Sequence, residues 1–142
     1  MSSKRIITEF NRVSEVYDAE MVGDNMRQWQ IALPGPDSTP YYGYTFLLQV
    51  DLPSTYPFTG PSVQFRTLIY HPNVSKKGEM CLNILNDWKP KNTILDVLAH
   101  VSSILVDPDA NNPLEPAIAA IYISHRSVYE TQARNLAQKY AV

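Results

Sequence analysis

Apolar residues at helical spacing open the chain. Positions i, i+4, i+7 and i+11 are taken by Ile6, Phe10, Val13 and Tyr17. This spacing predicts an amphipathic helix over residues 3–17, with Ser2 or Ser3 as its cap. The other side is charged, and a mixed-charge side of this kind is expected to face solvent; it carries Lys4, Arg5, Glu9 and Arg12.

Four short segments after this helix are typical of β-strands: residues 19–22, 26–33, 44–52 and 63–67. In the last three segments apolar and polar residues alternate, which places one side of each strand in a core. The apolar positions, of which Trp29 is the largest, are Trp29, Ile31, Leu33, Phe46, Leu48, Val50, Leu52, Val63 and Phe65. Because turns rich in Pro and Gly join these strands, we predict an antiparallel meander.

The last third of the chain has the pattern of three helices. Residues 93–106 are apolar over a wide arc, and Thr93 with Asp96 resembles a capping box, so this helix is expected to be central and largely buried. Asp107-Pro108 ends it. A second helix is predicted from Pro113, with Asn112 as its cap. Ser124 is expected to cap a third helix that runs to about residue 141 and turns Tyr129, Ala133, Leu136 and Tyr140 inward.

Composition limits the possible functions. The 142 residues are 44% hydrophobic and 18% charged, which is typical of one folded domain, here residues 1–142. Twelve basic and fourteen acidic residues give a net charge of −2, which does not favour a nucleic-acid partner. No apolar run is long enough for a membrane span or a signal segment. A single unpaired cysteine is typical of a reducing compartment, so we expect a cytoplasmic or nuclear protein.

Residues 69–92 show no sustained period, and a loop of this length usually serves a function. The loop contains Cys81, the only cysteine, which can be an inert buried thiol, a metal ligand or a nucleophile. The turn residues Lys76, Lys77 and Gly78 favour an exposed thiol with thiolate character. Asn73 offers an amide N–H to an oxyanion, so the segment suggests acyl transfer.

Two histidines are interpreted as structural. His71 lies ten residues before Cys81, and His100 lies on the predicted central helix. The sequence contains no His-Glu-x-x-His, no Cys-x-x-Cys and no glycine-rich phosphate loop. It therefore gives no support for a metal or nucleotide site.

Several motifs occur together in one order. His71-Pro72-Asn73 is followed by Gly-x-x-Cys-Leu-x-Ile-Leu at residues 78–85 and by Trp88-x-Pro90, with Asn73 eight residues before Cys81. The same order includes Pro34-Gly35-Pro36, Pro40-Tyr41-Tyr42-Gly43, Tyr56-Pro57-Phe58 before Pro61, Asp107-Pro108 and Asn112-Pro113-Leu114. This combination resembles the ubiquitin-conjugating enzyme family over about residues 3–141.

The resemblance implies an α+β fold with an N-terminal helix, a four-stranded antiparallel meander, an active-site loop and three C-terminal helices. It implies an acyltransferase in which Cys81 accepts ubiquitin from an activating enzyme as a thioester and passes it to a substrate lysine or a ligase cysteine. Asn73 would stabilise the oxyanion or hold the active loop. The activating enzyme uses the ATP, so no cofactor is expected. The implied partners are ubiquitin, the activating enzyme, ubiquitin ligases and substrate proteins.

Three further groups of positions follow from the resemblance. Lys4 and Arg5 match basic positions that bind the activating enzyme. Ligases would contact Phe58 and the loop that contains Trp88, Lys89 and Pro90. The positions around the incoming lysine are Asn83, Leu85, Asp109 and Asn112. Two of these depart from the family pattern, because Asn83 and Asn112 stand where Asp is common, and an amide cannot take a proton near neutral pH.

Three alternatives remain open. The modifier could be a ubiquitin-like protein, because Cys-Leu-Asn-Ile-Leu with Asp-Trp-Lys-Pro is also seen in a branch that carries one. That branch has an N-terminal extension that this sequence lacks, so ubiquitin is favoured. The chain could be a non-enzymatic ubiquitin-binding scaffold, although the presence of Cys81 argues against it. It could also be a cysteine hydrolase that uses Cys81 with His71.

Overall fold

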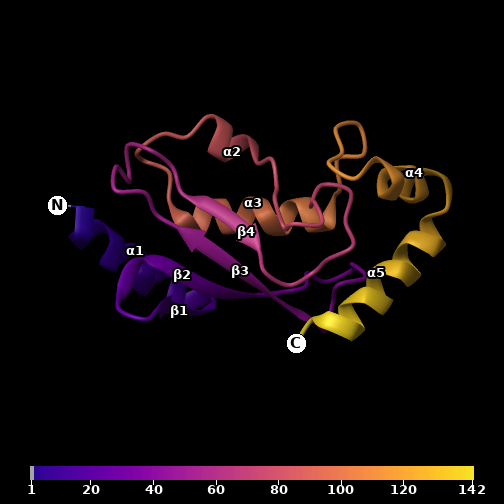
Figure 1. Cartoon of the computed structure of the whole chain (residues 1–142), viewed down its shortest axis with the longest axis horizontal. Helices are drawn as coiled ribbons and strands as arrows, with labels where there is room; N and C mark the ends of the chain where they lie inside the picture. The colour runs from indigo at the N-terminus through magenta and orange to yellow at the C-terminus, as the bar shows by residue number, and fades with distance from the viewer. Residues whose placement is uncertain (1) are drawn as a thin grey trace.

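The computed structural model describes residues 2–142, and its elements follow the predicted order (Figure 1). The helices are α1 (Ser2–Val16), α2 (Asn83–Asn86), α3 (Ile94–Val106), α4 (Pro116–Ser124) and α5 (Arg126–Tyr140). The strands are β1 (Asp18–Val22), β2 (Asn25–Pro34), β3 (Thr45–Asp51) and β4 (Ser62–Phe65). They pair in the order β1-β2-β3-β4, each antiparallel to the next, so the predicted meander is confirmed.

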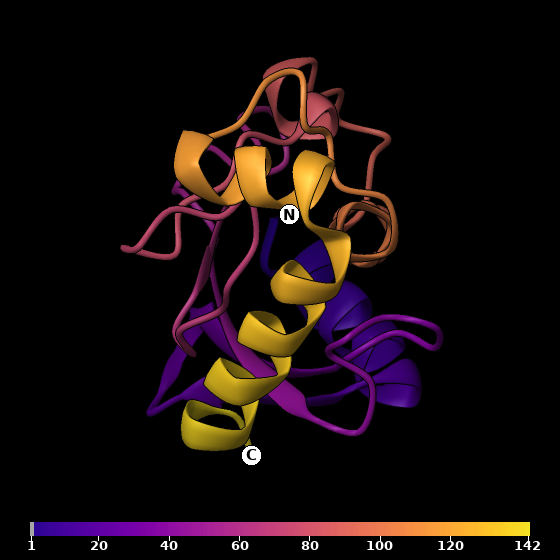
Figure 2. The same cartoon turned by 90° about the vertical axis from the view of Figure 1, so that its right-hand side faces the viewer.

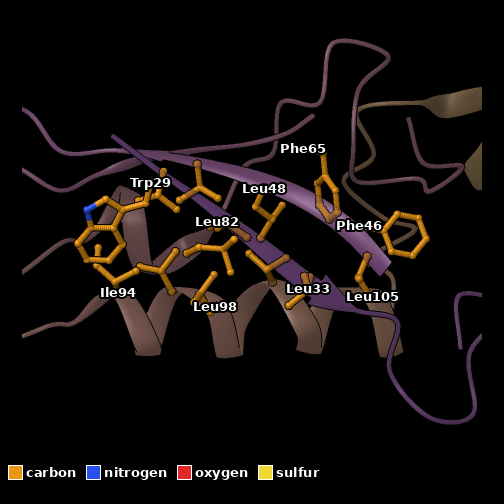
Figure 3. Packing of buried hydrophobic residues seen from close by; sticks show 14 of the residues in the cluster. Trp29, Leu33, Phe46, Leu48, Phe65, Leu82, Ile94, Leu98 and Leu105 are labelled. Atoms are coloured by element: carbon orange, nitrogen blue, oxygen red, sulfur yellow. The ribbon is translucent and has the colours of Figure 1, made fainter. Parts of the chain in front are cut away.

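The core lies between the sheet and α3 (Figure 3). Cross-strand partners on the inner side are apolar at each step, because Trp29 lies opposite Val50, Ile31 opposite Leu48 and Leu33 opposite Phe46. All six side chains are buried, as the alternating pattern predicts. The sheet therefore presents one apolar side to the helix.

Helix α3 has the predicted capping box. The Thr93 hydroxyl accepts the N–H of Asp96, and the Asp96 carboxylate accepts the N–H of Thr93. Five apolar residues of α3 are buried against the sheet: Ile94, Val97, Leu98, Val101 and Leu105. The capping box fixes the first turn of α3, and it therefore also fixes the residue at which the preceding loop ends.

Glu9 corrects the prediction for α1. The prediction placed it on the solvent side, but only 7% of its surface is exposed. Its carboxylate accepts hydrogen bonds from the Tyr56 hydroxyl, from Arg5 Nε at 2.8 Å and from the N–H of Ile94 at 2.8 Å. Burial of a carboxylate is tolerated where its oxygens are bonded in this way. Glu9 therefore joins α1 to the start of α3.

The two C-terminal helices begin later than predicted. Helix α4 begins at Pro116 with Glu115 at its cap position, so Asn112 does not cap it. Proline at the first position is the physical start signal, and the sequence contains that signal twice, at Pro113 and Pro116. Ser124 belongs to the end of α4, where its hydroxyl bonds to the Ala120 carbonyl, so it does not cap α5. Tyr140, predicted inward, is 49% exposed.

Helices α4 and α5 pack together at one end of the molecule, and α1 lies at the other end (Figures 1 and 2). The chain between β4 and α3 includes the short helix α2, which lies above α3 in the view of Figure 1. Within residues 2–142 no helix has both the length and the apolar character needed to cross a membrane.

Candidate active site

The turn before Cys81 depends on one glycine. Gly78 has a φ of +85°, and a Cβ at this position would lie 2.0 Å from the carbonyl oxygen of Phe65. Any side chain would therefore collide with the backbone of β4. The turn closes with a bridge between Val74 and Met80, directly before the cysteine.

The thiol itself is accessible. Cys81 is exposed, whereas the next residue, Leu82, is 1% exposed and belongs to the core (Figure 3). Leu82 thus anchors the segment, and Cys81 points away from the core. This exposure contradicts the inert buried thiol, and the nucleophile role of Cys81 stays a prediction.

His71 has the predicted structural role. It is fully buried, its Nε2–H donates to the Ile104 carbonyl at 2.9 Å, and its Nδ1 accepts the N–H of Asn73 at 2.9 Å. Burial lowers the pKa of His71 to about 4. Since both ring nitrogens are bonded inside the protein, neither is free to act as a base on Cys81.

Asn73 is held by the loop that follows α3. Its Oδ1 accepts the N–H of Asp109 at 2.8 Å, and its Nδ2 donates to the carbonyl of Asp109 at 2.8 Å. A longer contact of 3.5 Å joins Nδ2 to the carbonyl of Asn112. The side chain, 7% exposed, therefore connects the segment before Cys81 to residues 109–114, hereafter the 109–114 loop.

These elements enclose a hollow of about 270 Å³, hereafter the Cys81 hollow. Its walls come from the segment 81–86, from α3 and from the 109–114 loop, with Asn73 between them. The residues that line it are Asn73, Cys81, Asn83, Asn86, His100, Ser103, Ile104, Asp109, Asn112 and Leu114. Its lining contains four asparagines and a single carboxylate.

The structure brings together most of the residues expected near the incoming lysine. Asn83, Asp109 and Asn112 line the Cys81 hollow, but Leu85 does not and instead packs half-buried against the core. The carboxylate of Asp109 accepts the N–H of Asn111 at 3.1 Å. Lys76 and Lys77, which the sequence suggested as neighbours of the thiol, do not line the hollow.

His100 differs from its prediction. It was interpreted as a structural residue of α3, yet it is exposed and lines the Cys81 hollow. Its ring makes no hydrogen bond within residues 2–142. The signal for this was available in the helical period, because His100, Ser103 and Ile104 are spaced to share one side of a helix.

The predicted ligase-binding residues lie in two connected loops. Phe58 is 80% exposed, so it does not fill the core. Trp88 Nε1 donates to the carbonyl of Pro57 at 2.8 Å, which ties the second loop to the first. Lys89 and Pro90 are exposed beside it. An exposed aromatic side chain next to a fixed loop is typical of a recognition surface.

The predicted activating-enzyme residues have different surroundings. Lys4 is exposed, whereas Arg5 is half-buried and bonded to a distant loop of the chain. The Arg5 guanidinium donates to the carbonyls of Pro90 and Asn92, both at 2.6 Å, besides its ion pair with Glu9. Arg5 therefore connects α1 to the loop that contains Trp88, and this contact was not visible in the sequence.

Comparisons with known proteins agree with this arrangement. A model of the ubiquitin-conjugating enzyme family matches residues 5–137. The solved E2 domain of a Toxoplasma gondii ubiquitin-conjugating enzyme is 30% identical over 100% of both chains, with a TM-score of 0.95. A Plasmodium yoelii structure assigned as a ubiquitin-conjugating enzyme is 29% identical over 98% of this chain and 94% of its own, with a TM-score of 0.92.

The chain belongs to the ubiquitin-conjugating enzyme family, and it has the family's α+β fold. No group of three or more His, Cys, Asp or Glu side chains that could hold a metal ion occurs in residues 2–142.

The buried His71 predicts a pH-dependent stability. An unfolded histidine titrates near 6.5, whereas the pKa of His71 in the folded protein is about 4. Between these values the unfolded chain binds more protons, so stability is full above about pH 6.5 and falls as the pH falls toward 4. From about pH 7.5 to about pH 4.5 this group should lower the free energy of unfolding by about 2–3 kcal/mol.

Denaturant unfolding of the unmodified protein, His71→Gln and His125→Gln at both pH values measures this contribution. The loss between the two pH values should be smaller in His71→Gln by about 2–3 kcal/mol. His125→Gln, a change at an exposed histidine, is the matched control and should keep the loss of the unmodified protein. An equal loss in all three proteins would contradict the prediction.

Proposed function

We propose that this protein is a ubiquitin-conjugating acyltransferase that carries ubiquitin as a thioester on Cys81. The single observation that carries the proposal is the exposed Cys81 in a polar hollow between α3 and the 109–114 loop. Family membership and the similarity to the Toxoplasma gondii and Plasmodium yoelii structures support it.

The proposed chemistry has two acyl transfers. The Cys81 thiolate attacks the C-terminal carbonyl carbon of ubiquitin on the activating enzyme, and the thiolate of that enzyme leaves. A substrate lysine amine or a ligase cysteine then attacks the Cys81 thioester, and Cys81 leaves as a thiolate. No further cofactor is required, because the activating enzyme spends the ATP.

Asn73 is proposed to act chiefly by holding the 109–114 loop. Its Oδ1 and one N–H are bonded to the backbone of Asp109, which supports this role. The second N–H of Nδ2 has only the 3.5 Å contact with Asn112, so it can still donate to an oxyanion in the hollow. The two roles suggested by the sequence are therefore compatible.

Two surfaces are proposed for the protein partners. Phe58 with the loop containing Trp88, Lys89 and Pro90 would contact ligases. The exposed Lys4 on α1 would contact the activating enzyme, with Arg5 fixing the adjoining loop. Since Arg5 bonds to the carbonyl of Pro90, the two surfaces share one structural element.

The cysteine hydrolase that pairs Cys81 with His71 is not supported, since both nitrogens of His71 are bonded and the ring is buried. A scaffold without enzymatic activity has no need of an exposed thiol in a polar hollow. We therefore favour acyl transfer over both, with ubiquitin as the modifier and a ubiquitin-like protein as the second candidate.

Charging of Cys81 tests the proposal. The protein is incubated with activating enzyme, ATP and ubiquitin, and in parallel with the activating enzyme of a ubiquitin-like modifier and that modifier. We expect a ubiquitin adduct that thiol reductant removes, since a thioester exchanges with thiols. Intact-mass spectrometry gives the stoichiometry.

Two variants serve as controls. Cys81→Ala should give no adduct, and Cys81→Ser should give an adduct that resists reductant, because its hydroxyl forms an oxygen ester. Absence of any reducible adduct on the unmodified protein would refute the proposal. Charging by the other modifier alone would keep the chemistry and change the modifier.

The presence of Asn83 and Asn112 in the Cys81 hollow leads to a prediction of which nucleophile discharges the thioester faster. Asn83 and Asn112 cannot accept a proton, and a lysine amine is almost wholly protonated near neutral pH, so discharge to free lysine is limited by the few other groups of the hollow that can accept one. Discharge to free cysteine should be faster, because a thiol ionises more readily. Asn112→Asp should raise the lysine rate by about tenfold or more, a modest share of general-base effects.

Single-turnover discharge of the charged protein measures both rates. Asn111→Asp, which adds the same charge at an exposed residue outside the lining of the hollow, is the matched control. Rapid lysine discharge by the unmodified protein, or an equal gain in both variants, would argue against the assignment of Asn112.

A further inference from the structure

His100 is the imidazole in the lining of the Cys81 hollow. It comes from the middle of α3, on the wall that also includes Ser103 and Ile104, and it is exposed. Nothing in residues 2–142 bonds to its ring, in contrast to the fully bonded and buried His71. The ring is therefore available to a molecule that enters the hollow.

The hollow contains few groups that can accept a proton. Besides the Cys81 thiol, its titratable side chains are His100 and Asp109, and the remaining polar ones are asparagine amides and the Ser103 hydroxyl. Oδ1 of the Asp109 carboxylate accepts the N–H of Asn111, and within residues 2–142 only its second oxygen is without such a bond. On α3 itself, Asp96 lies one turn before His100, and its carboxylate is held by Thr93 in the capping box.

The attack of an amine on a thioester releases a proton. The amine nitrogen bonds to the carbonyl carbon, the C–S bond breaks, Cys81 leaves as a thiolate, and the nitrogen must lose one proton to become the amide. An imidazole ordinarily changes protonation between about pH 5 and 8, which makes it a suitable acceptor near neutral pH.

We propose that His100 is a catalytic proton acceptor for lysine in the Cys81 hollow, a role that rests on the proposed function. The neutral imidazole takes the proton from the attacking amine, directly or through one water molecule, and then returns it to solvent. A thiolate nucleophile has no such proton to lose. The proposal therefore predicts selective loss of lysine discharge when His100 is removed.

The experiment uses His100→Ala, with His125→Ala, a change at an exposed histidine outside the hollow, as the matched control. Each protein is charged with ubiquitin, and single-turnover discharge to free lysine and to free cysteine is measured near pH 8. Alanine favours helix and the site is exposed, so α3 should keep its fold. Equal charging of the three proteins verifies this.

The expected result for His100→Ala is a fall in lysine discharge of about tenfold or more near pH 8, with unchanged cysteine discharge. Added imidazole should restore lysine discharge in His100→Ala more than it raises that of the unmodified protein.

Other results overturn the proposal. Equal loss with lysine and cysteine would make His100 a residue that positions the acyl donor, and an unchanged lysine rate would exclude it from the reaction. Both leave the proposed function intact, because the thioester still forms. Failure of the unmodified protein to form a thioester would instead refute the proposed function and this inference with it.

Discussion

The Cys81 hollow depends on one pair of hydrogen bonds between a side chain and a distant backbone. Asn73 accepts the N–H of Asp109 and donates to its carbonyl, both at 2.8 Å, and so holds the 109–114 loop against the segment that leads to Cys81. His71 connects Asn73 to α3, since its ring accepts the Asn73 N–H and donates to the Ile104 carbonyl. All three walls of the hollow are thus tied together by buried polar groups, whereas the Cys81 thiol is exposed. Loss of a buried hydrogen-bond partner costs about 1–3 kcal/mol, enough to change the position of such a loop.

A second buried polar group organises the opposite end of the molecule. The Glu9 carboxylate accepts hydrogen bonds from Arg5, Tyr56 and the N–H of Ile94. This one side chain therefore joins α1, the segment before β4 and the start of α3. The Tyr56 ring lies 5.8 Å from that of Trp88, and Arg5 reaches the carbonyls of Pro90 and Asn92. The proposed ligase surface and the proposed activating-enzyme helix are consequently parts of one bonded unit.

The sequence predicted what periodicity and local motifs determine. The alternation in β2 and β3, the apolar arc of α3 and its capping box are local patterns, and each was confirmed. It could not predict Glu9, because two of the three partners of this residue lie 47 and 85 positions away and residue type alone favours exposure. Pro113 and Pro116 are equivalent start signals in the sequence, and the N–H groups of Leu114 and Glu115 between them donate to the Pro72 carbonyl, a distant partner that no local pattern predicts. The membership of Cys81, Asn83, Asp109 and Asn112 in one hollow agrees with the family pattern. The helical period places His100 on one side of α3 with Ser103 and Ile104, but only the structure shows that this side lines the hollow.

Amide hydrogen exchange at Asp109 tests most directly whether Asn73 holds the 109–114 loop in place at the Cys81 hollow. The measurement compares the unmodified protein with Asn73→Ala by nuclear magnetic resonance, and the N–H of Asp107 serves as the internal control because it bonds to the Ser103 carbonyl, independently of Asn73. Loss of a hydrogen bond of this kind should raise the exchange rate of the Asp109 N–H by about tenfold or more, with no change at Asp107. Equal protection of Asp109 in both proteins would contradict the account, since the loop would then be held by something other than Asn73.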